Sequence, residues 1–472
     1  MDAAPPRRKA GRRPGPGPAG RLLLVAGLTV VPVVVALGSV SAAPLAPPLG
    51  ACGGPDCPAT FPPANNGDFA GRDSTINVFV GGDYSVVGRA AEAEGKIVTL
   101  GDLSIAKTDG GVFNMGVVGV GSRVVPPDGS DFVTVGGSIS VAAGNAMLVG
   151  GSDSKGAATG NVRFGGTSTG TVDIVDPGQQ IHDTGAANPY LAVRTQIEDV
   201  SACAATAAVT GTVTLTSSEA TFTGDGTSMR QVFDVTGNLA SPSGGSIGLD
   251  FTGIPSGATV VVNMLSDDAV INTYTGDGTG TDQVGLLGPR LLWNFPTATS
   301  PSIIGSAQFA GSVMAGNPAS TTTIAPPGFN GRVYLAGNLL QQGTGGFEIH
   351  NYPFDGDLPD CTTPTPTATE TTTTATPTAT ETTTTPTPTS TTTTPTPTSN
   401  GTGSTTAGTR APATASATPT ATSPGPSGSP GHPGGPLAET GGEVLPVAGL
   451  GIALLGAGVT AVQWSRARRR RH

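Results

Sequence analysis

The stretch Phe79-Val80-Gly81-Gly82-Asp83-Tyr84-Ser85-Val86 decides the expected fold, because two short apolar segments flank a pair of glycines. β-Branched and aromatic residues favour strands, and glycine permits the bend between them. Related units recur at residues 100–105, 133–141, 148–151, 164–167, 310–313 and 336–339. The first five glycine corners, at positions 81, 101, 136, 150 and 165, stand 20, 35, 14 and 15 residues apart. Such spacing predicts the coils of a β-solenoid, each burying its inward side chains on its neighbours.

We therefore predict an all-β fold, a right-handed β-helix (solenoid) over residues 65–359 within a head that spans residues 50–361. A sandwich of two antiparallel sheets with glycine-rich hairpins competes with it, and periodicity alone leaves the two nearly equal. One flanking α-helix is expected near 189–206. Asn188 suits its N-cap, Pro189 suits its first position, and one apolar face, for packing on the head, is formed by Val193, Ile197, Val200 and Ala204.

The C-terminal residues predict an anchor. Leu437-Ala438-Glu439-Thr440-Gly441 precedes a nearly uncharged stretch at 444–464 and then the cluster Arg466, Arg468, Arg469, Arg470 and Arg471. About twenty apolar residues can cross a bilayer as a helix, and the arginines favour a cytoplasmic end. In order and spacing, residues 437–472 resemble the sorting signal of sortase substrates, in the Leu-Ala-x-Thr-Gly form associated with actinobacterial class E sortases.

That resemblance implies chemistry in which this chain is the substrate. A sortase cysteine attacks the Thr440 carbonyl, Gly441 leaves with the membrane segment, and an amine of the peptidoglycan precursor resolves the thioester. The precursor is then transiently membrane-anchored, and the product is attached covalently to the cell wall. A C-terminal transmembrane anchor that is never cut is the alternative.

The N-terminal 43 residues predict export. Six basic residues precede an apolar run at 22–37 and small residues up to Ala43. This is the layout of a secretory signal peptide, with cleavage expected near Ala42 or Ala43. The exported protein is therefore expected to be extracellular.

Charge excludes one class of partner. Six of the 23 Lys+Arg lie in residues 1–43 and five follow Gly441, whereas only two of the 33 Asp+Glu lie in these segments. The mature chain keeps 12 basic and 31 acidic residues, a net charge of −19. Too few cations remain to neutralise a phosphate backbone, so no nucleic-acid partner is expected.

Residues 362–436 are rich in threonine, proline and serine and contain almost no apolar side chain to bury. Such composition is typical of a disordered, low-complexity stalk, extended by its prolines and open to O-glycosylation on its threonines. Its place between the head and the anchor predicts that it carries the head through the wall.

Several motifs in the head occur together in the order of one known family. They are 76–84 and 94–97 near the start, then 293–296, 309–315, 330–339 and 348–356. In these motifs the head, from about Asn65 to Pro359, resembles the choice-of-anchor A family. The resemblance implies a β-helical adhesive domain of bacterial surface proteins, related in style to ice-binding-like folds, with no established catalytic residues. We accordingly expect an adhesin with a glycan or protein ligand, with a passive surface component or a glycan-active enzyme as alternatives.

Three residues could suggest an active site. Glu348 and His350 would face the same side of a strand, and Asp355 follows closely. Glycan-cleaving sites need paired acid and base groups, usually with more carboxylates or cations beside them. The head has only two histidines, His182 and His350, so we predict a structural role in the last coil and no enzyme activity.

We predict no metal and no cofactor. Calcium could bind at 277–282 or at Asp225-Gly226, but both lack a full EF-hand or nonapeptide pattern and both suit turns. A zinc site at Cys52 and Cys57 would lack a second ligand pair. The alternation Thr212, Thr214 and Thr216 could form a flat ice-matching array, although exposed strands are often threonine-rich.

Four cysteines, Cys52, Cys57, Cys203 and Cys361, all lie in the exported part. An even count outside the cell favours two disulfides, for which three connectivities exist. We prefer Cys52 with Cys57 as a local loop and Cys203 with Cys361 as a staple where the stalk begins.

Overall fold

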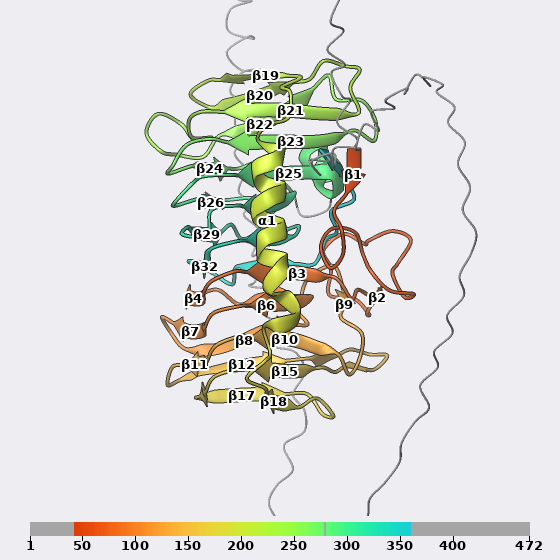
Figure 1. Cartoon of the computed structure of the whole chain (residues 1–472), viewed down its shortest axis with the longest axis vertical. Coiled ribbons are helices and arrows are strands. Elements are labelled where there is room, and N and C mark those ends of the chain that lie inside the picture. The colour runs from red at the N-terminus through yellow and green to blue at the C-terminus, as the bar shows by residue number, and fades with distance from the viewer. Residues whose placement is uncertain (1–41, 278–279, 360–472) are drawn as a thin grey trace, which may run out of the picture. The chain divides into compact units, whose positions relative to one another are not determined.

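The computed structural model describes residues 42–277 and 280–359. Most of them form three parallel sheets that wrap around one apolar core, so the predicted solenoid of stacked coils is confirmed and the antiparallel sandwich is excluded. In Figure 1 the strands stack as rungs, one coil above another. A typical coil contributes one strand to each sheet, as β3, β4 and β5 do. The hand of the coil stays a prediction.

The largest sheet has ten strands. In spatial order they are β18 (Gln180–His182), β15 (Asn161–Phe164), β10 (Asp131–Val135), β6 (Lys96–Thr99), β3 (Ile76–Val80), β31 (Val333–Leu335), β28 (Ser312–Ala315), β25 (Leu291–Phe295), β23 (Thr259–Met264) and β21 (Arg230–Val235).

The second sheet has eight strands. They are β16 (Ser168–Thr169), β11 (Ile139–Val141), β7 (Leu103–Lys107), β4 (Tyr84–Gly88), β32 (Asn338–Gln341), β29 (Thr321–Ala325), β26 (Ser302–Gly305) and β24 (Val270–Thr273).

The third sheet has seven strands. They are β17 (Thr171–Ile174), β12 (Asn145–Val149), β8 (Gly111–Gly116), β5 (Glu92–Glu94), β33 (Glu348–His350), β30 (Gly328–Asn330) and β27 (Gln308–Ala310).

Smaller pairings close the flanks and one end of the stack. These are β1 (Ala42–Pro44) with β34 (Asp357–Pro359), β2 (Gly71–Arg72) with β9 (Val124–Val125), β13 (Gly151–Ser152) with β14 (Ala157–Ala158), and the sheet of β19 (Thr212–Leu215), β20 (Glu219–Thr223) and β22 (Gly248–Thr252). The three-stranded sheet brings Phe222 and Phe251 together, stacked with ring centroids 4.5 Å apart, beside Trp293 of the core.

The order of the coils does not follow the chain. The first coil, β3 to β5, lies between the second coil and the last coil, β31 to β33. The chain therefore starts in the middle of the stack, runs to the end at β18, crosses to the other end and returns to the middle. We call the boundary between the first and last coils the seam. Tyr84 donates a hydrogen bond across it to Gln341, and both side chains are buried.

The glycine pairs predicted from sequence form the corner between the ten-stranded and eight-stranded sheets. Consecutive coils meet there through backbone hydrogen bonds of 2.7–2.9 Å that join Gly337, Gly82, Gly101, Gly137 and Gly166 in a column. A Cβ atom at Gly81 would lie 2.2 Å from the carbonyl oxygen of Ala336, so only glycine fits. Gly150 also forms a corner between two strands, β12 and β13, but at a different place in the coil.

Within residues 42–277 and 280–359 two α-helices accompany the sheets, where the sequence predicted one flanking helix. The predicted helix is α1 (Leu191–Ala204), preceded by the 3-10 turn η1 (Asn188–Tyr190), so Tyr190 and not Asn188 is its N-cap. The second, α2 (Gln283–Leu287), precedes the 3-10 turn η2 (Gly288–Arg290). None of the helices among the described residues is long and apolar enough to span a membrane, and the predicted span at 444–464 lies outside those residues.

Helix α1 runs along the stack and covers the outer side of the ten-stranded sheet (Figure 1). Val193, Ile197 and Ala204 pack there against outward apolar side chains of the sheet, such as Phe79, which confirms that the predicted stripe is a packing face. Ser201 fixes the helix further, because its hydroxyl donates to Asn294 Oδ1 at 2.6 Å.

Candidate functional site

The outer side of the eight-stranded sheet forms the first candidate site. Its central column is Val270, Ser302, Thr323, Leu340, Ser85, Ser104, Ser140 and Thr169, one residue from each strand in register. A parallel partial column contains Ile304, Ala325, Val87 and Ala106. All twelve side chains are partly or fully exposed, and none belongs to a buried apolar cluster. We call these twelve positions the bare face.

The bare face carries no charge. Among the residues of the eight strands, Lys107 at the end of β7 is the only charged one. The column offers hydroxyls and small aliphatic groups instead, and Ser104 Oγ donates to Ser85 Oγ at 3.1 Å. In a chain with a net charge of −10 this is an unusual concentration of neutral surface. Parallel strands place equivalent side chains about 4.8 Å apart, so the face is a flat, regular array.

A ladder of polar side chains borders the bare face at the glycine corner. The backbone N–H of Asp83 donates to Asn338 Oδ1 at 2.8 Å, that of Asp102 to Asp83 Oδ1 at 2.8 Å, and that of Ser138 to Asp102 Oδ1 at 2.7 Å. Each side chain thus ties its own coil to the next. These aspartates are structural, and the sequence signal that could have revealed them is a polar residue after each glycine corner.

The outer side of the seven-stranded sheet differs, because a polar set of side chains is buried or half-buried there. We call this set the covered face, and it consists of Gln308, Asn330, His350, Glu348, Glu92, Glu94 and Asn114. Residues 45–75 form the N-terminal arm, whose part at 57–63 lies beside Gln308 and Asn330, and residues 117–125 lie over Glu92 and Glu94. Glu94 accepts backbone hydrogen bonds from Ser122, Arg123 and Asn351 at 2.8–2.9 Å.

Glu348 and His350 lie on one side of β33, as predicted from their spacing. His350 Nε2 lies 3.0 Å from Glu348 Oε2, and His350 Nδ1 lies 2.7 Å from Asn330 Oδ1. Burial raises the pKa of Glu348 to about 8. Burial also lowers the pKa of His350, although Glu94 and Glu92 oppose that shift. Both pKa shifts favour the neutral form of each group. The Glu348 carboxyl then donates to His350 Nε2, and His350 donates its Nδ1 proton to Asn330 Oδ1.

Asp355 does not complete a constellation with this pair. Its backbone N–H donates to the Pro289 carbonyl at 2.7 Å, and its carboxyl group is exposed. Burial raises the pKa of Asp355, while the nearby charges of Arg332 and Arg290 act in the opposite direction. The acid and base of the sequence motif are therefore a buried hydrogen-bonded pair, and the third residue contacts other groups.

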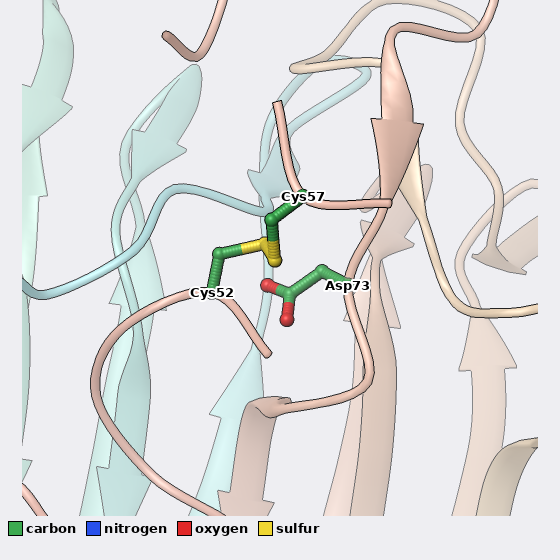
Figure 2. Close-up of side chains that lie close together, drawn as sticks. All are labelled: Cys52, Cys57 and Asp73. Atoms are coloured by element: carbon green, nitrogen blue, oxygen red, sulfur yellow. A yellow bond between two sulfur atoms is a disulfide. The ribbon is translucent and has the colours of Figure 1, made fainter. Parts of the chain in front are cut away.

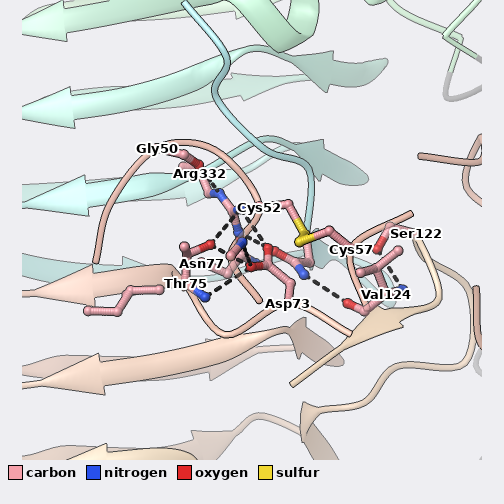
Figure 3. A network of polar contacts seen from close by, with 12 residues as sticks. Gly50, Cys52, Cys57, Asp73, Thr75, Asn77, Ser122, Val124 and Arg332 are labelled. Atoms are coloured by element: carbon pink, nitrogen blue, oxygen red, sulfur yellow. Dashed lines mark hydrogen bonds and ion pairs between the residues drawn. A yellow bond between two sulfur atoms is a disulfide. The ribbon is translucent and has the colours of Figure 1, made fainter. Parts of the chain in front are cut away.

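A buried ion pair fastens the N-terminal arm to the last coil (Figure 3). Arg332 Nη2 lies 2.7 Å from Asp73 Oδ2, and both side chains are fully buried. Arg332 also donates to the Gly50 carbonyl at 3.1 Å and to Thr75 Oγ1 at 2.9 Å. Burial alone would raise the pKa of Asp73, but the charge of Arg332 and the hydrogen bonds from Thr75 and Gly53 outweigh it, and the pKa falls below its usual value. Sequence reasoning missed this pair, whose members lie 259 residues apart.

The structure offers one cluster with metal-ligand atoms among residues 42–277 and 280–359, and its chemistry argues against a metal. It consists of Cys52, Cys57 and Asp73 (Figure 2). The two sulfurs form a disulfide, and the carboxylate is the partner of Arg332. Metal binding needs thiolates, so these atoms do not fit a metal.

The candidate calcium residues are engaged in turns. The Asp225 carboxylate accepts hydrogen bonds from the backbone of Thr227 and Ser228 at 2.8 Å. Asp277 accepts from Thr281 Oγ1 at 3.0 Å, and Asp282 caps α2 by accepting from Gly285 N at 2.7 Å. The absence of a cofactor stays a prediction. Thr212, Thr214 and Thr216 are exposed on or beside β19, in an antiparallel hairpin away from the bare face.

The remaining predicted site residues divide between the described part and the rest. Cys203 Sγ lies 3.4 Å from the Pro359 carbonyl oxygen, two residues before Cys361. Cys361 itself lies outside the described residues, so the Cys203–Cys361 bond stays a prediction. The sorting residues Leu437, Ala438, Glu439, Thr440 and Gly441 also lie outside them, as do the stalk and residues 1–41 of the predicted signal peptide, whereas Ala42 and Ala43 belong to β1.

Comparison with known families defines the class of this fold. The family model described as "Putative Ice-binding-like adhesive domain" matches residues 70–351. The chain belongs to this family of ice-binding-like adhesive domains.

Among solved structures, the crystal structure of an ice binding protein from an Antarctic Biological Consortium is 14% identical in sequence, and the match covers 63% of this chain and 93% of that protein. The TM-score is 0.20, too low to support any inference about this chain. No curated protein sequence matches the chain.

Proposed function

We propose that the chain is a bacterial surface adhesin. A non-catalytic solenoid head is carried on the stalk at 362–436, joined covalently to the cell wall through Thr440, and binds neutral glycan or protein surfaces through the bare face. The observation that carries this proposal is the uncharged bare face on an acidic protein. Membership in a family of adhesive domains supports it, and the sorting signal read from the sequence supports the anchor.

Charge decides which surfaces the bare face fits. An acidic protein repels anionic polymers, and at physiological ionic strength this repulsion extends over about 8 Å. That distance is shorter than the width of the sheet. Contact through an uncharged face avoids placing carboxylates against the partner. Neutral surfaces therefore bind without mediating cations, whereas anionic ones need them.

The size of the bare face predicts weak binding by a single head. Eight strands at about 4.8 Å spacing span roughly 34 Å, and four or five residues at about 3.3 Å each give roughly 15 Å of width. The resulting area of roughly 500 Å² is below the 800 Å² or so per partner that stable protein complexes bury. Firm attachment then requires many heads on one wall, acting together through multivalency.

A direct test places charge on the bare face. Ser104→Glu and Leu340→Glu, combined in the full chain, should reduce attachment of cells to neutral glycan and protein surfaces by about tenfold or more, since each contact is multiplied across heads. Thr214→Glu, exposed in the antiparallel hairpin of β19, is the matched control and should leave attachment unchanged. Equal attachment by the wild-type, double-variant and control strains would remove the bare face from the proposal.

The anchor is tested separately. Thr440→Ala should move the protein from the covalent wall fraction to the membrane or the medium, because the sortase cysteine acts at that carbonyl. Deletion of residues 362–436 should keep the protein in the wall but lower attachment and cell aggregation. If wild-type, Thr440→Ala and stalk-deleted cells attached equally, a passive surface component would be the better description.

A further inference from the structure

A cavity of about 710 Å³ lies on the covered face, on the opposite side of β27 and β30 from the core. Its floor is formed by Gln308 of β27 and Asn330 of β30. One wall is the part of the N-terminal arm at 57–63, and the other is the segment that carries α2 and η2. Ligand sites in proteins have volumes of about 300–1,000 Å³, so this cavity is large enough for an organic ligand.

The floor presents amide groups in fixed positions. Asn330 Oδ1 accepts from His350 Nδ1 at 2.7 Å, and Asn330 Nδ2 donates to Gln308 Oε1 at 3.5 Å, so the two floor amides hold each other in place. The side chain of Gln308 lies across Gly328, where a Cβ atom would come within 1.9 Å of Gln308 Oε1. Glycine at 328 therefore makes room for the Gln308 amide to lie flat on the sheet. Amides so placed can donate to and accept from hydroxyl groups of a ligand.

The arm wall presents aromatic and proline surfaces that are already ordered. The rings of Phe61 and Tyr352 lie 6.1 Å apart with an interplanar angle of 49°. Tyr352 donates from its hydroxyl to the Pro62 carbonyl at 2.9 Å, and the Cys52–Cys57 disulfide closes the loop just before this wall. Prolines and a fixed aromatic pair lose little entropy on binding, so the wall is preorganised.

The cavity lining is selective by charge. It contains the carboxylates of Asp277, Asp282 and Asp355 and, among the described residues that form it, no lysine, arginine or histidine. Asp277 and Asp282 accept hydrogen bonds from their own loop and from α2. Asp355 is exposed in the cavity, where Arg290 and Arg332 offset part of its charge. An anionic ligand would be repelled, whereas hydroxyl donors could bind the Asp355 carboxylate.

We propose that this cavity binds a neutral saccharide. A sugar ring has an apolar C–H face that packs on aromatic rings and hydroxyls that both donate and accept. The Phe61 and Tyr352 rings suit the apolar face of the sugar, and its hydroxyls suit Gln308, Asn330 and Asp355. This site lies on a different sheet from the bare face and does not depend on it.

Binding by the purified full chain can test the site. Neutral disaccharides (cellobiose, maltose, lactose, diacetylchitobiose) would be compared with glucuronic acid, N-acetylneuraminic acid and a hexalysine peptide, by saturation-transfer NMR and calorimetry. We expect at least one neutral sugar to bind and the acidic sugars to fail. Gln308→Ala and Phe61→Ala should each weaken that binding about tenfold, the size of effect that one lost hydrogen bond or stacking contact can produce.

Gly328→Ala keeps every ligand-contacting side chain but displaces Gln308, and it should weaken binding similarly while the thermal midpoint stays near wild type. Ser104→Glu on the bare face is the matched control and should bind sugar normally. The proposal is overturned if no neutral sugar binds at about 10 mM, which nearly fills a site with a Kd of about 1 mM. Preference for an acidic sugar or for hexalysine, or unchanged affinity in all three cavity variants, overturns it equally. None of these results bears on cell attachment through the bare face.

Discussion

The bare face and the covered face belong to the same coils but place their polar side chains in opposite environments. On the bare face, Ser85 and Ser104 meet solvent and no carboxylate is present. On the covered face, Glu92 and Glu94 point outward from β5 and are nevertheless fully buried. The difference arises because residues 117–125 lie over β5 and donate backbone hydrogen bonds to Glu92 and Glu94. The outer side of a β-solenoid sheet can thus be open to solvent or buried, depending on whether other segments of the chain lie over it.

The attachment of the N-terminal arm to the last coil should depend most on the buried Asp73–Arg332 ion pair. Asp73→Asn would leave the Arg332 charge buried without its partner, so we expect the free energy of unfolding to fall by about 3–5 kcal/mol. Urea unfolding measures this loss. Asp109→Asn is the matched control, because the Arg89–Asp109 pair has the same kind of geometry at 2.6 Å but is exposed. Exposed pairs contribute at most about 1 kcal/mol. Equal losses of unfolding free energy in the two variants would contradict the expectation that the buried pair stabilises the protein more than the exposed pair.

The seam should be the next most sensitive feature. Gly81→Ala places a Cβ atom 2.2 Å from the Ala336 carbonyl oxygen of the last coil, a backbone atom that cannot move aside cheaply. We expect a loss of about 1–3 kcal/mol in the free energy of unfolding. Gly237→Ala, where a Cβ atom would meet nothing within 4 Å, is the control and should change stability little. A harmless Gly81→Ala would show that the coils are not in close contact at this corner.

The covered face should also give the protein a pH dependence that the bare face cannot. The folded-state pKa of Glu348 is raised to about 8 from 4.5, so its contribution to stability is fully present below about pH 4.5 and is lost as pH rises through 8. His350, with a lowered pKa, destabilises the fold only as pH falls below about 6.5. Between pH 6.5 and 8 stability should therefore fall with rising pH, by at most about 1.4 kcal/mol per unit.

Glu348→Gln removes the titrating group while keeping a donor for His350, and it should flatten that slope in chemical unfolding measured across pH 6.5–8. Glu219→Gln, on the exposed β20, should retain the wild-type slope. An unchanged slope in Glu348→Gln would assign the pH dependence to another group.

The smallest effect is expected on the bare face itself. Ser104→Asp adds a carboxylate to an exposed position and should change the free energy of unfolding by no more than about 0.5 kcal/mol. Asn114→Asp, in the next strand of the same coil, adds one where Asn114 Nδ2 donates to Glu92 Oε1 at 2.6 Å, and should cost about 1–3 kcal/mol. Thermal unfolding of the two variants compares the faces directly. Similar midpoints would show that burial does not change the destabilisation caused by an added carboxylate.

Local features of the fold could be predicted from the sequence, because they follow from short-range chemistry. Gly81 and Gly82 had to form a corner, and the apolar stripe of α1 had to pack on the head. The order of the coils could not be predicted, since nothing near Phe79 indicates that its strand pairs with Tyr334.

The covered face was also beyond reach of the sequence. Nothing in the sequence links Glu92 and Glu94 to Gly119, Ser122 and Arg123, whose backbone N–H groups donate to their carboxylates. Glu348 and His350 were correctly placed on one side of a strand, but nothing in their spacing indicated that both side chains are buried.

The central position of the first coil has a consequence for how the solenoid is completed as the chain is synthesised. While only the residues up to the end of α1 are available, the first coil has a neighbour on one side only, and the edges of β3, β4 and β5 remain open. Those edges are closed only when β31, β32 and β33 arrive, more than 250 residues after β3 begins. Unpaired strand edges invite pairing with other chains. The incomplete head is thus most vulnerable to association with other chains until its final coil docks beside the first coil.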